Sequence, residues 1–415
     1  MLTAGVDVAS TNIAYHGNMQ NPDTFRFTDA NETIEATTLT LGSGDNFTDG
    51  NDKDKDVLHI TLQNYDVSKT IGTGSGEVGN GVTINGIEVL DIDATAGGAN
   101  TITYKGGFTS ITDLIIRGAF DATTGTGLNV SVSSDSALKT VDLTGVSYAG
   151  GSGLVFTAGT NANDLTISGP SFNANITGGN GNDTITAQGT INGGSGNDVI
   201  TGKGSIEGGV GNDTITATGL STIKGGDGND TISGYGLIYG DSYDDSASTY
   251  SGSGDDIITL TGTATVVGGS GADTITTSTE GVVTFKYSGS GKTAQGTGKT
   301  ATAAFKTVAA ASLTADTLTV KVGDKIDLSD ITLVKTAILQ NDGSAYKLAD
   351  DLEVTDGTGD VFLLENGDTY LLAYEISDGS TDFGKTDSAG FEVIKLVGLT
   401  AANKITLENG IVTIV

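Results

Sequence analysis

The stretch GGNGNDTIT, residues 178–186, decides the fold, because its Gly-Gly-x-Gly-x-Asp phrase and β-branched triplet keep returning. Full copies follow at 193–201, 208–216, 225–233 and 268–276, and a degenerate copy lies at 251–259. Each triplet, such as Thr184-Ile185-Thr186, alternates polar, apolar and polar residues, which predicts a very short strand with one core residue. Since one such coil cannot bury its isoleucine alone, we expect the coils to stack.

The spacing of the phrases predicts a narrow coil with two strands. The first residues of successive copies lie 15, 15, 17, 26 and 17 residues apart, whereas nonapeptides on both edges of a coil need about 18. A second apolar position stands two residues before each expected loop, at Ile191, Ile206, Ile223, Ile238 and Val266. The returning turns carry no acidic phrase, so we expect them to be tight and metal-free; they are 187–190, 202–205, 217–222 and 234–236.

The interval of 26 residues is one coil of 15 with an insertion of 11, residues 240–250. This insertion carries Asp241, Asp244 and Asp245. Two interpretations stay open, a further cation site or contact, and a solvated acidic loop.

The loops have the composition of calcium sites on one edge of the coil. Ca²⁺ takes six to eight oxygens at about 2.3–2.6 Å, and glycine lets a loop turn its carbonyls inward. Stacked about 4.8 Å apart, neighbouring loop carboxylates repel by roughly 3–4 kcal/mol at an effective dielectric near 20. We therefore expect several Ca²⁺ ions between adjacent loops and a fold that closes only when they bind. The candidate ligands are Asp183, Asp198, Asp213, Asp230, Asp256 and Asp273, with Asp227 and Asp255, and the loop positions Gly178, Asn180, Gly193, Ser195, Gly208, Val210, Gly225, Gly268 and Ser270.

Composition agrees with a chain of short strands and turns. Among 415 residues there are 64 glycines and 2 prolines, and the formal charge is −31. Such a charge argues against nucleic acid and anionic membrane surfaces as partners, and it favours a polycation or a metal as the counter-charge. There is no cysteine, so disulfides and Cys-ligated zinc are excluded. We see neither a signal peptide of the usual N-terminal kind nor an apolar run long enough for a membrane helix.

A second acidic stretch lies near the N-terminus, between two apolar runs. It carries Asp45, Asp49, Asp52 and Asp56, together with Asp54. Five aspartates in twelve positions predict a calcium loop. The interleaved Lys53 and Lys55 keep open the alternative of a solvated charged turn.

From about 80 to 167 a wider repeat predicts a broader parallel coil, again with two strands. Its aligned apolar triplets are Ile87/Leu90/Ile92, Ile111/Leu114/Ile116, Leu138/Val141/Leu143 and Ala162/Leu165/Ile167. Further strand candidates lie at 101–104, 128–132 and 154–157. Residues 159–167 also match the acidic phrase in degraded form, closing with Asp164, which we add to the candidate ligands. We therefore expect the wide coil to pass continuously into the narrow one, which hides the sheet edges of every internal coil.

The C-terminal part has another character. Residues 286–300 have the composition of a linker, and their two Gly-Lys-Thr triplets lack the glycine and the strand-to-helix context of a phosphate loop. Residues 305–415 predict a compact β-rich domain with one or two short helices, one of them near 345–352.

No catalytic constellation is evident. His16 and His59 lie in no zinc or nucleophile motif, and His59 is expected on the outer face of a strand. Paired carboxylates are too abundant to indicate a glycosidase, and we expect Asp91 and Asp93, which flank Ile92, to sit in water.

The tandem acidic phrases resemble those of the RTX calcium-binding nonapeptide family. Phrases such as GDKIDLSDI, residues 323–331, resemble the segment that follows the repeats in RTX and S-layer proteins. In that family this segment caps the roll and holds an uncleaved secretion signal. The resemblance implies an all-β fold, with a right-handed parallel β-solenoid (1–158) running into an RTX calcium β-roll (159–284) and a C-terminal β-rich capping and secretion domain (285–415).

The whole order of elements is similar to Gram-negative bacterial S-layer proteins exported by type I secretion. The resemblance implies a non-enzymatic protein of the cell surface, secreted through that machinery and assembled by calcium with copies of itself into a two-dimensional lattice. No N-terminal anchoring domain is evident, so lipopolysaccharide would be a partner only through a region outside this sequence. The alternatives are the non-catalytic tail of a secreted RTX enzyme or toxin, and an RTX adhesin.

Overall fold

The computed structural model divides into two compact units, residues 1–206 and 207–415. The residues that it describes are 13–14, 24–26, 31–37, 45–49, 54–62, 68–71, 75, 82–94, 101–105, 108, 110–120, 128–132, 137–148, 153–160, 163–244, 249–269, 271, 273–277, 281–286, 316–319, 322, 324–327, 336–341, 346–347, 361–366, 369–375, 391–397, 405–408 and 411–414.

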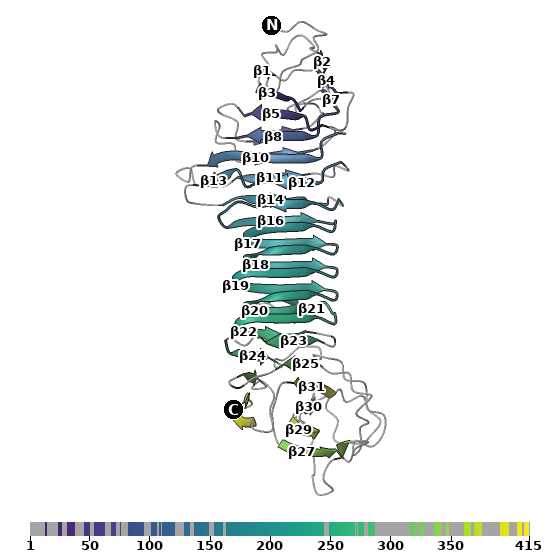
Figure 1. Ribbon diagram of the computed structural model, residues 1–415, viewed down its shortest axis with the longest axis vertical. Coiled ribbons are helices and arrows are strands. Elements are labelled where there is room, and N and C mark those ends of the chain that lie inside the picture. Colours follow the sequence, from purple (N-terminus) through teal and green to yellow (C-terminus); the bar gives the residue numbers. More distant parts are fainter. Residues whose placement is uncertain are drawn as a thin grey trace. The chain divides into compact units, whose positions relative to one another are not determined.

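The first unit is a stack of mostly parallel strands, coloured purple to teal in Figure 1. Its strands are β1 (Ile13–Ala14), β2 (Thr24–Arg26), β3 (Thr33–Thr37), β4 (Asn46–Thr48), β5 (Val57–Thr61), β6 (Ser68–Ile71), β7 (Thr83–Asn85), β8 (Val89–Asp93), β9 (Thr101–Tyr104), β10 (Asp113–Phe120), β11 (Asn129–Val132), β12 (Thr140–Asp142), β13 (Val146–Tyr148), β14 (Val155–Thr157), β15 (Thr166–Ser168), β16 (Ala174–Gly179) and β17 (Thr184–Ser195); β18 (Val199–Val210) runs across the unit boundary.

Most of these strands form three parallel files, because successive coils place equivalent strands side by side, while β13 pairs parallel with the end of β10. One file runs β1, β3, β5, β8, β10, β12, β15 and the start of β17, and a second runs β6, β9, β11, β14, β16 and the end of β17. The third file, β2, β4 and β7, is confined to the first coils. The predicted passage from wide to narrow coil is confirmed by β15 and β16, which both pair with β17.

The core of the first file is a column of one apolar side chain per coil. It consists of Ile34, Leu58, Leu90, Leu114, Val141, Ile167 and Ile185, which are paired in register and at most 1% exposed. The last wide repeat was aligned wrongly in the sequence: Ile167, not Leu165, faces Val141. Leu165 is itself buried just before the strand, so both residues fit the apolar pattern and spacing alone selects the wrong one.

The narrow coil differs from the prediction of two strands with a tight turn between them. β17 runs unbroken through 187–190 while its start pairs with β15 and its end with β16. Gly189 makes the bend, with φ of 117°, and a Cβ there would overlap the Ala174 backbone of the coil before. Glycine is therefore required where the chain turns from one sheet into the other.

The second unit continues with the same construction. Its strands are β19 (Thr214–Asp227), β20 (Thr231–Asp244), β21 (Thr249–Ser251), β22 (Ile257–Val267), β23 (Thr274–Thr277), β24 (Val283–Lys286), β25 (Asp316–Thr319), β26 (Lys325–Asp327), β27 (Thr336–Asn341), β28 (Tyr346–Lys347), β29 (Val361–Asn366), β30 (Thr369–Glu375), β31 (Phe391–Val397), β32 (Ile405–Glu408) and β33 (Ile411–Ile414).

The parallel stack of this unit runs from β19 through β20 and β22 to β23 and β24, and then to β25 and β26. β31 pairs parallel with β25, whereas β33 pairs antiparallel with β26 and β30 lies antiparallel between β29 and β31. The short helix expected near 345–352 is wrong for Tyr346 and Lys347, which form β28. The described part of the chain is all β, and no helix in it is suited to span a membrane.

Candidate metal centre

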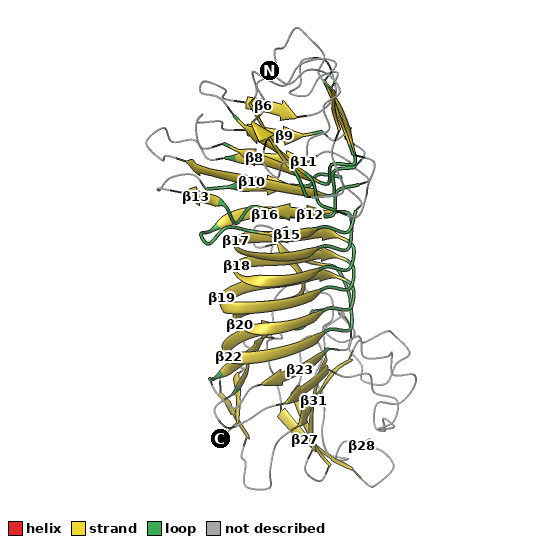
Figure 2. Ribbon diagram, turned by 45° about the horizontal axis from the view of Figure 1, so that its top comes forward, coloured by secondary structure: helices red, strands yellow, loops and turns green. Residues whose placement is uncertain are grey.

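The acidic phrases form loops at one edge of the strands, as predicted (Figure 2). In the copy at 193–201 the glycines at the second and fourth positions have left-handed φ values, 112° at Gly194 and 124° at Gly196. A Cβ at either position would overlap the backbone of the coil before. The phrase is therefore glycine-rich because consecutive loops touch backbone to backbone.

The last residue of each phrase is a fully buried carboxylate, which we call the corner aspartate. All are at most 1% exposed: Asp183 and Asp198 in the first unit, and Asp213, Asp230, Asp256 and Asp273 in the second. Each position lies immediately before the first core triplet of its coil.

One oxygen of the corner aspartates bonds to the previous coil. The Asp183 N–H donates to Asp198 Oδ1 at 2.7 Å, and the Asp230 N–H donates to Asp256 Oδ1 at 2.8 Å. The Asp213 N–H and Asp256 N–H donate in the same way to Asp230 and Asp273. These bonds align the carboxylates in columns through Oδ1, and Oδ2 takes no part in them.

The second oxygen, Oδ2, of Asp183 and of Asp230 is buried and accepts no hydrogen bond. Asp230 Oδ2 and the Gly240 carbonyl both crowd the open side of Gly225, where a Cβ would overlap them. Asp183 Oδ2 and the Gly193 carbonyl do the same at Gly178. Carboxylate and carbonyl oxygens thus converge beside Gly178 and Gly225, and this is the donor set that Ca²⁺ prefers.

Burial disfavours the charged form of these aspartates. It raises the pKa of Asp183 to about 7, of Asp198 to about 6 and of Asp230 to about 8. Neighbouring carboxylates add to the shift at Asp230, and the backbone donors oppose it. Desolvation therefore raises these pKa values more than repulsion between neighbouring carboxylates does. The sequence predicted repulsion as the main obstacle to ionisation.

This predicts an unusual pH dependence for calcium-stripped protein. A carboxylate with a raised native pKa favours the fold when protonated, below the ordinary pKa near 4, and loses that stability as pH rises to about 8. We expect the melting temperature of the stripped protein, followed by circular dichroism, to be lower at about pH 8 than at about pH 5. A melting temperature that rises from about pH 5 to about pH 8 would contradict the raised pKa values of these aspartates.

The fifth position of the phrase forms an exposed ladder rather than part of the buried columns. The Asn197 N–H donates to Asn182 Oδ1 at 2.7 Å, and the Asn182 N–H donates to Asp164 Oδ1 at 2.8 Å. In the second unit the Asp255 N–H donates to Asn229 Oδ1 at 2.9 Å. Asp164 and Asp255 are therefore exposed rungs of this ladder.

The alignment that made Asp164 a loop-closing aspartate is wrong by one position. The residue opposite Asp183 is Leu165, whose N–H donates to Asp183 Oδ1 at 2.8 Å. A leucine can hold this place because the buried column begins only with the next coil.

The remaining predicted positions divide by burial. The first glycines of the phrases are buried: Gly178, Gly193, Gly208, Gly225 and Gly268. At the third position Asn180, Val210 and Asp227 are exposed and Ser195 is half-buried. Ser270 lies outside the described residues.

The insertion is a β-hairpin that splits one phrase. Gly240, not Ser251, takes the first position, because Asp256 Oδ2 and the Gly268 carbonyl crowd it as their equivalents crowd Gly225. β20 and β21 then pair antiparallel, and Gly252 resumes the phrase. Asp241 is fully buried at the hairpin base, where it raises the pKa of Asp230 further. The side chain of Asp244 and all of Asp245 lie outside the described part.

Sequence reasoning also missed Asp324. It is fully buried, and its Oδ1 accepts the Val283 N–H at 3.1 Å, as the corner aspartates accept theirs. A Gly-Asp pair before a short apolar strand is the only sequence signal at this position.

The N-terminal acidic stretch is buried in part. Asp45 and Asp56 are fully buried and Asp49 is 7% exposed, whereas Asp52 lies outside the described residues. The carboxylates of Asp49, Asp54 and Asp56 lie within 4.8 Å of one another. Asp45 is not a member of this group.

The outer face near His59 is less exposed than expected. Asp91 is 3% exposed, which contradicts its expected place in water, and it accepts from the Arg117 guanidinium. His59 Nδ1 lies 3.0 Å from Asp91 Oδ2, and this hydrogen bond raises the pKa of His59. Asp93 is half-buried.

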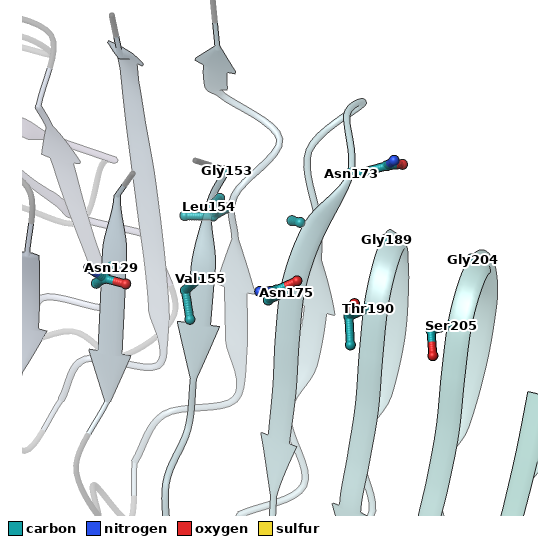
Figure 3. Close-up of a pocket in the computed structure, with 11 residues that line it drawn as sticks. Asn129, Gly153, Leu154, Val155, Asn173, Asn175, Gly189, Thr190, Gly204 and Ser205 are labelled. Carbon is teal, nitrogen blue, oxygen red and sulfur yellow. The ribbon is translucent and has the colours of Figure 1, made fainter. Parts of the chain in front are cut away.

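A groove of about 590 Å³ crosses the second file of the first unit. Figure 3 shows Asn129, Asn175, Thr190 and Ser205 along it, from neighbouring coils. Its lining holds amides, hydroxyls and backbone, with no titratable side chain. It thus offers neither a general acid nor a metal ligand of the carboxylate type.

The fold and these corners define a parallel β-solenoid protein with columns of buried carboxylates. No protein-family model matches the chain, and no curated protein sequence matches it.

Proposed function

We propose that this chain is a calcium-stabilised structural protein of the bacterial surface that assembles with its own copies into an S-layer lattice. The observation that supports calcium is the column of corner aspartates, whose Oδ2 atoms lie beside backbone carbonyls. A buried charge needs a counter-charge or a proton, and a divalent cation supplies the first where pH is neutral.

The residues that would hold the ions follow from this arrangement. In the first unit they are Asp183 and the carbonyl of Gly193. In the second they are the corner aspartates with the first glycine of the next coil: Asp213 with Gly225, Asp230 with Gly240, and Asp256 with Gly268. Bound Ca²⁺ would supply the positive charge that lets these carboxylates ionise without opening the coil.

Coupling of folding to calcium suits export as an unfolded chain. Ionised columns oppose closure where free calcium is micromolar or lower, and calcium at millimolar levels outside the cell restores it. Secretion by a type I machinery and the lattice itself rest on the resemblance of the phrases to RTX and S-layer proteins.

Calcium-titrated light scattering with electron microscopy tests this proposal. We expect purified chain to scatter little in chelator and to form ordered sheets at millimolar calcium. A variant with Asp183, Asp213 and Asp230 changed to Asn should need higher calcium, whereas D142N, outside the columns, should behave as the parent. A folded, calcium-bound protein that stays monomeric would contradict the lattice and favour the tail of an RTX enzyme or toxin, or an adhesin.

A further inference from the structure

The first unit carries a second acidic column, far in sequence from the glycine phrases. The residue immediately before the core strand is Glu32 at β3, Asp56 at β5 and Glu88 at β8. The strand register places these three at the same corner of successive coils. It is the corner at which Asp183 stands later in the same file.

The hydrogen bonds repeat those of the corner aspartates. The Glu32 N–H donates to Asp56 Oδ1 at 2.8 Å, and the Asp56 N–H donates to Glu88 Oε2 at 3.0 Å. Asp56 and Glu88 thus accept from the coil before, although no Gly-Gly-x-Gly-x-Asp phrase precedes any of the three acids.

Two further acids reach this column from the side. Asp49 follows β4 and Asp54 precedes β5, and their carboxylates lie within 4.8 Å of that of Asp56 and of each other. Lys55, which lies between Asp54 and Asp56 in sequence, pairs instead with Asp113 at 3.1 Å. Asp49, Asp54 and Asp56 therefore form the cluster, and Glu32 and Glu88 are the neighbours of Asp56 in the column.

Asp56 provides the independent sign of a ligand. Its side chain is fully buried, yet Oδ2 accepts no hydrogen bond, and neither buried oxygen of Asp54 accepts one. Burial raises the pKa of Asp56 to about 7, and Asp54, Glu32 and Asp49 add repulsion. Burial raises the pKa of Glu88 as well.

We propose that Asp49, Asp54 and Asp56 form a site for one hard divalent cation, with Glu32 and Glu88 as neighbouring carboxylates. The all-oxygen donors and the several carboxylates favour Ca²⁺. The site is separate from the glycine phrases, because the corner position carries Thr112, Lys139 and Leu165 on the coils between. It would fasten the side file of β4 and β7 to the main file at the start of the solenoid. It does not depend on calcium in the roll.

The test is hydrogen exchange by mass spectrometry on the full chain, with and without calcium, beside calorimetric counting of bound ions. We expect calcium to protect residues 31–62 and 82–94, and the double variant D49N/D54N to lose this protection and one bound ion. Protection of residues 178–277 should stay, since those loops are untouched. D142N, in the same unit but outside the cluster, serves as the matched control.

A second variant guards against misfolding. E88Q keeps an acceptor for the Asp56 N–H but removes one charge, and we expect at least tenfold weaker calcium binding at this site. Unchanged ion number and unchanged N-terminal protection in both variants would overturn the proposal. Calcium protection at 31–62 without protection at 178–277 would keep this site and refute the calcium-binding roll.

Discussion

Calcium-stripped protein at about pH 8 is expected to lose most of the parallel sheet of residues 163–277. The reason is the burial of six corner aspartates, whose ionisation the fold does not tolerate without a counter-charge. With free calcium about 100-fold above Kd, each occupied site adds about 2.7 kcal/mol. Several sites together rival the 5–15 kcal/mol that stabilises a typical domain. Far-ultraviolet circular dichroism during a calcium titration measures the transition.

The variant D230N distinguishes ionised aspartates that bind calcium from aspartates that are buried in protonated form. Asparagine keeps the acceptor for the Asp213 N–H but carries no charge. We expect it to raise the melting temperature of the stripped protein at about pH 8 and to weaken calcium binding. A variant that lowers the stripped melting temperature and leaves calcium affinity unchanged would refute a metal role for Asp230.

The variant G226A is expected to destabilise the second unit by about 3 kcal/mol or more. Gly226 has a φ of 127°, and a Cβ there would overlap the Gly209 carbonyl of the preceding coil. Alanine therefore adds backbone strain and forces two stacked loops apart. Urea unfolding at saturating calcium measures the loss.

Gly262 gives the matched control in the same unit. A Cβ at Gly262 would lie 3.3 Å from the Tyr235 side chain, with no backbone in its way. We expect G262A to change stability by less than about 1 kcal/mol. Equal effects of both substitutions would show that coil-to-coil contact does not explain the glycines.

The core of the solenoid was predictable because its signal repeats. Ile185 and Ile191 were expected to be buried, and they are at most 1% exposed. The same holds for the wide repeat at Leu90, Leu114 and Val141. Stacking in register requires one apolar residue per coil, so even short strands can be recognised from the periodic spacing of apolar residues in the sequence.

The errors lie where two residues fit one pattern. Leu165 and Ile167 are both buried, so apolar spacing does not tell which one faces Val141. The hairpin separates the first glycine of its phrase, Gly240, from the second, Gly252. Ser251 directly precedes Gly252, so the sequence alone suggests Ser251 as the first residue. Only the contacts between coils resolve these alternatives.

The N-terminal column could not be read from sequence for a different reason. Glu32, Asp56 and Glu88 are separated by 24 and 32 residues, as their hydrogen bonds show. A single acid before a strand is common, and these three become a column only through the register of β3, β5 and β8. The charge pattern of residues 45–56 pointed to the region, but not to Glu32 or Glu88.

Anomalous diffraction from crystals grown with calcium tests the central claim most directly. We predict calcium peaks beside Oδ2 of Asp183 and Asp230, each within about 2.3–2.6 Å of the carboxylate and of a carbonyl oxygen of the next coil. Crystals at neutral pH with ordered loops and no anomalous peak at these carboxylates would contradict it, and would show that the columns are closed by protons instead.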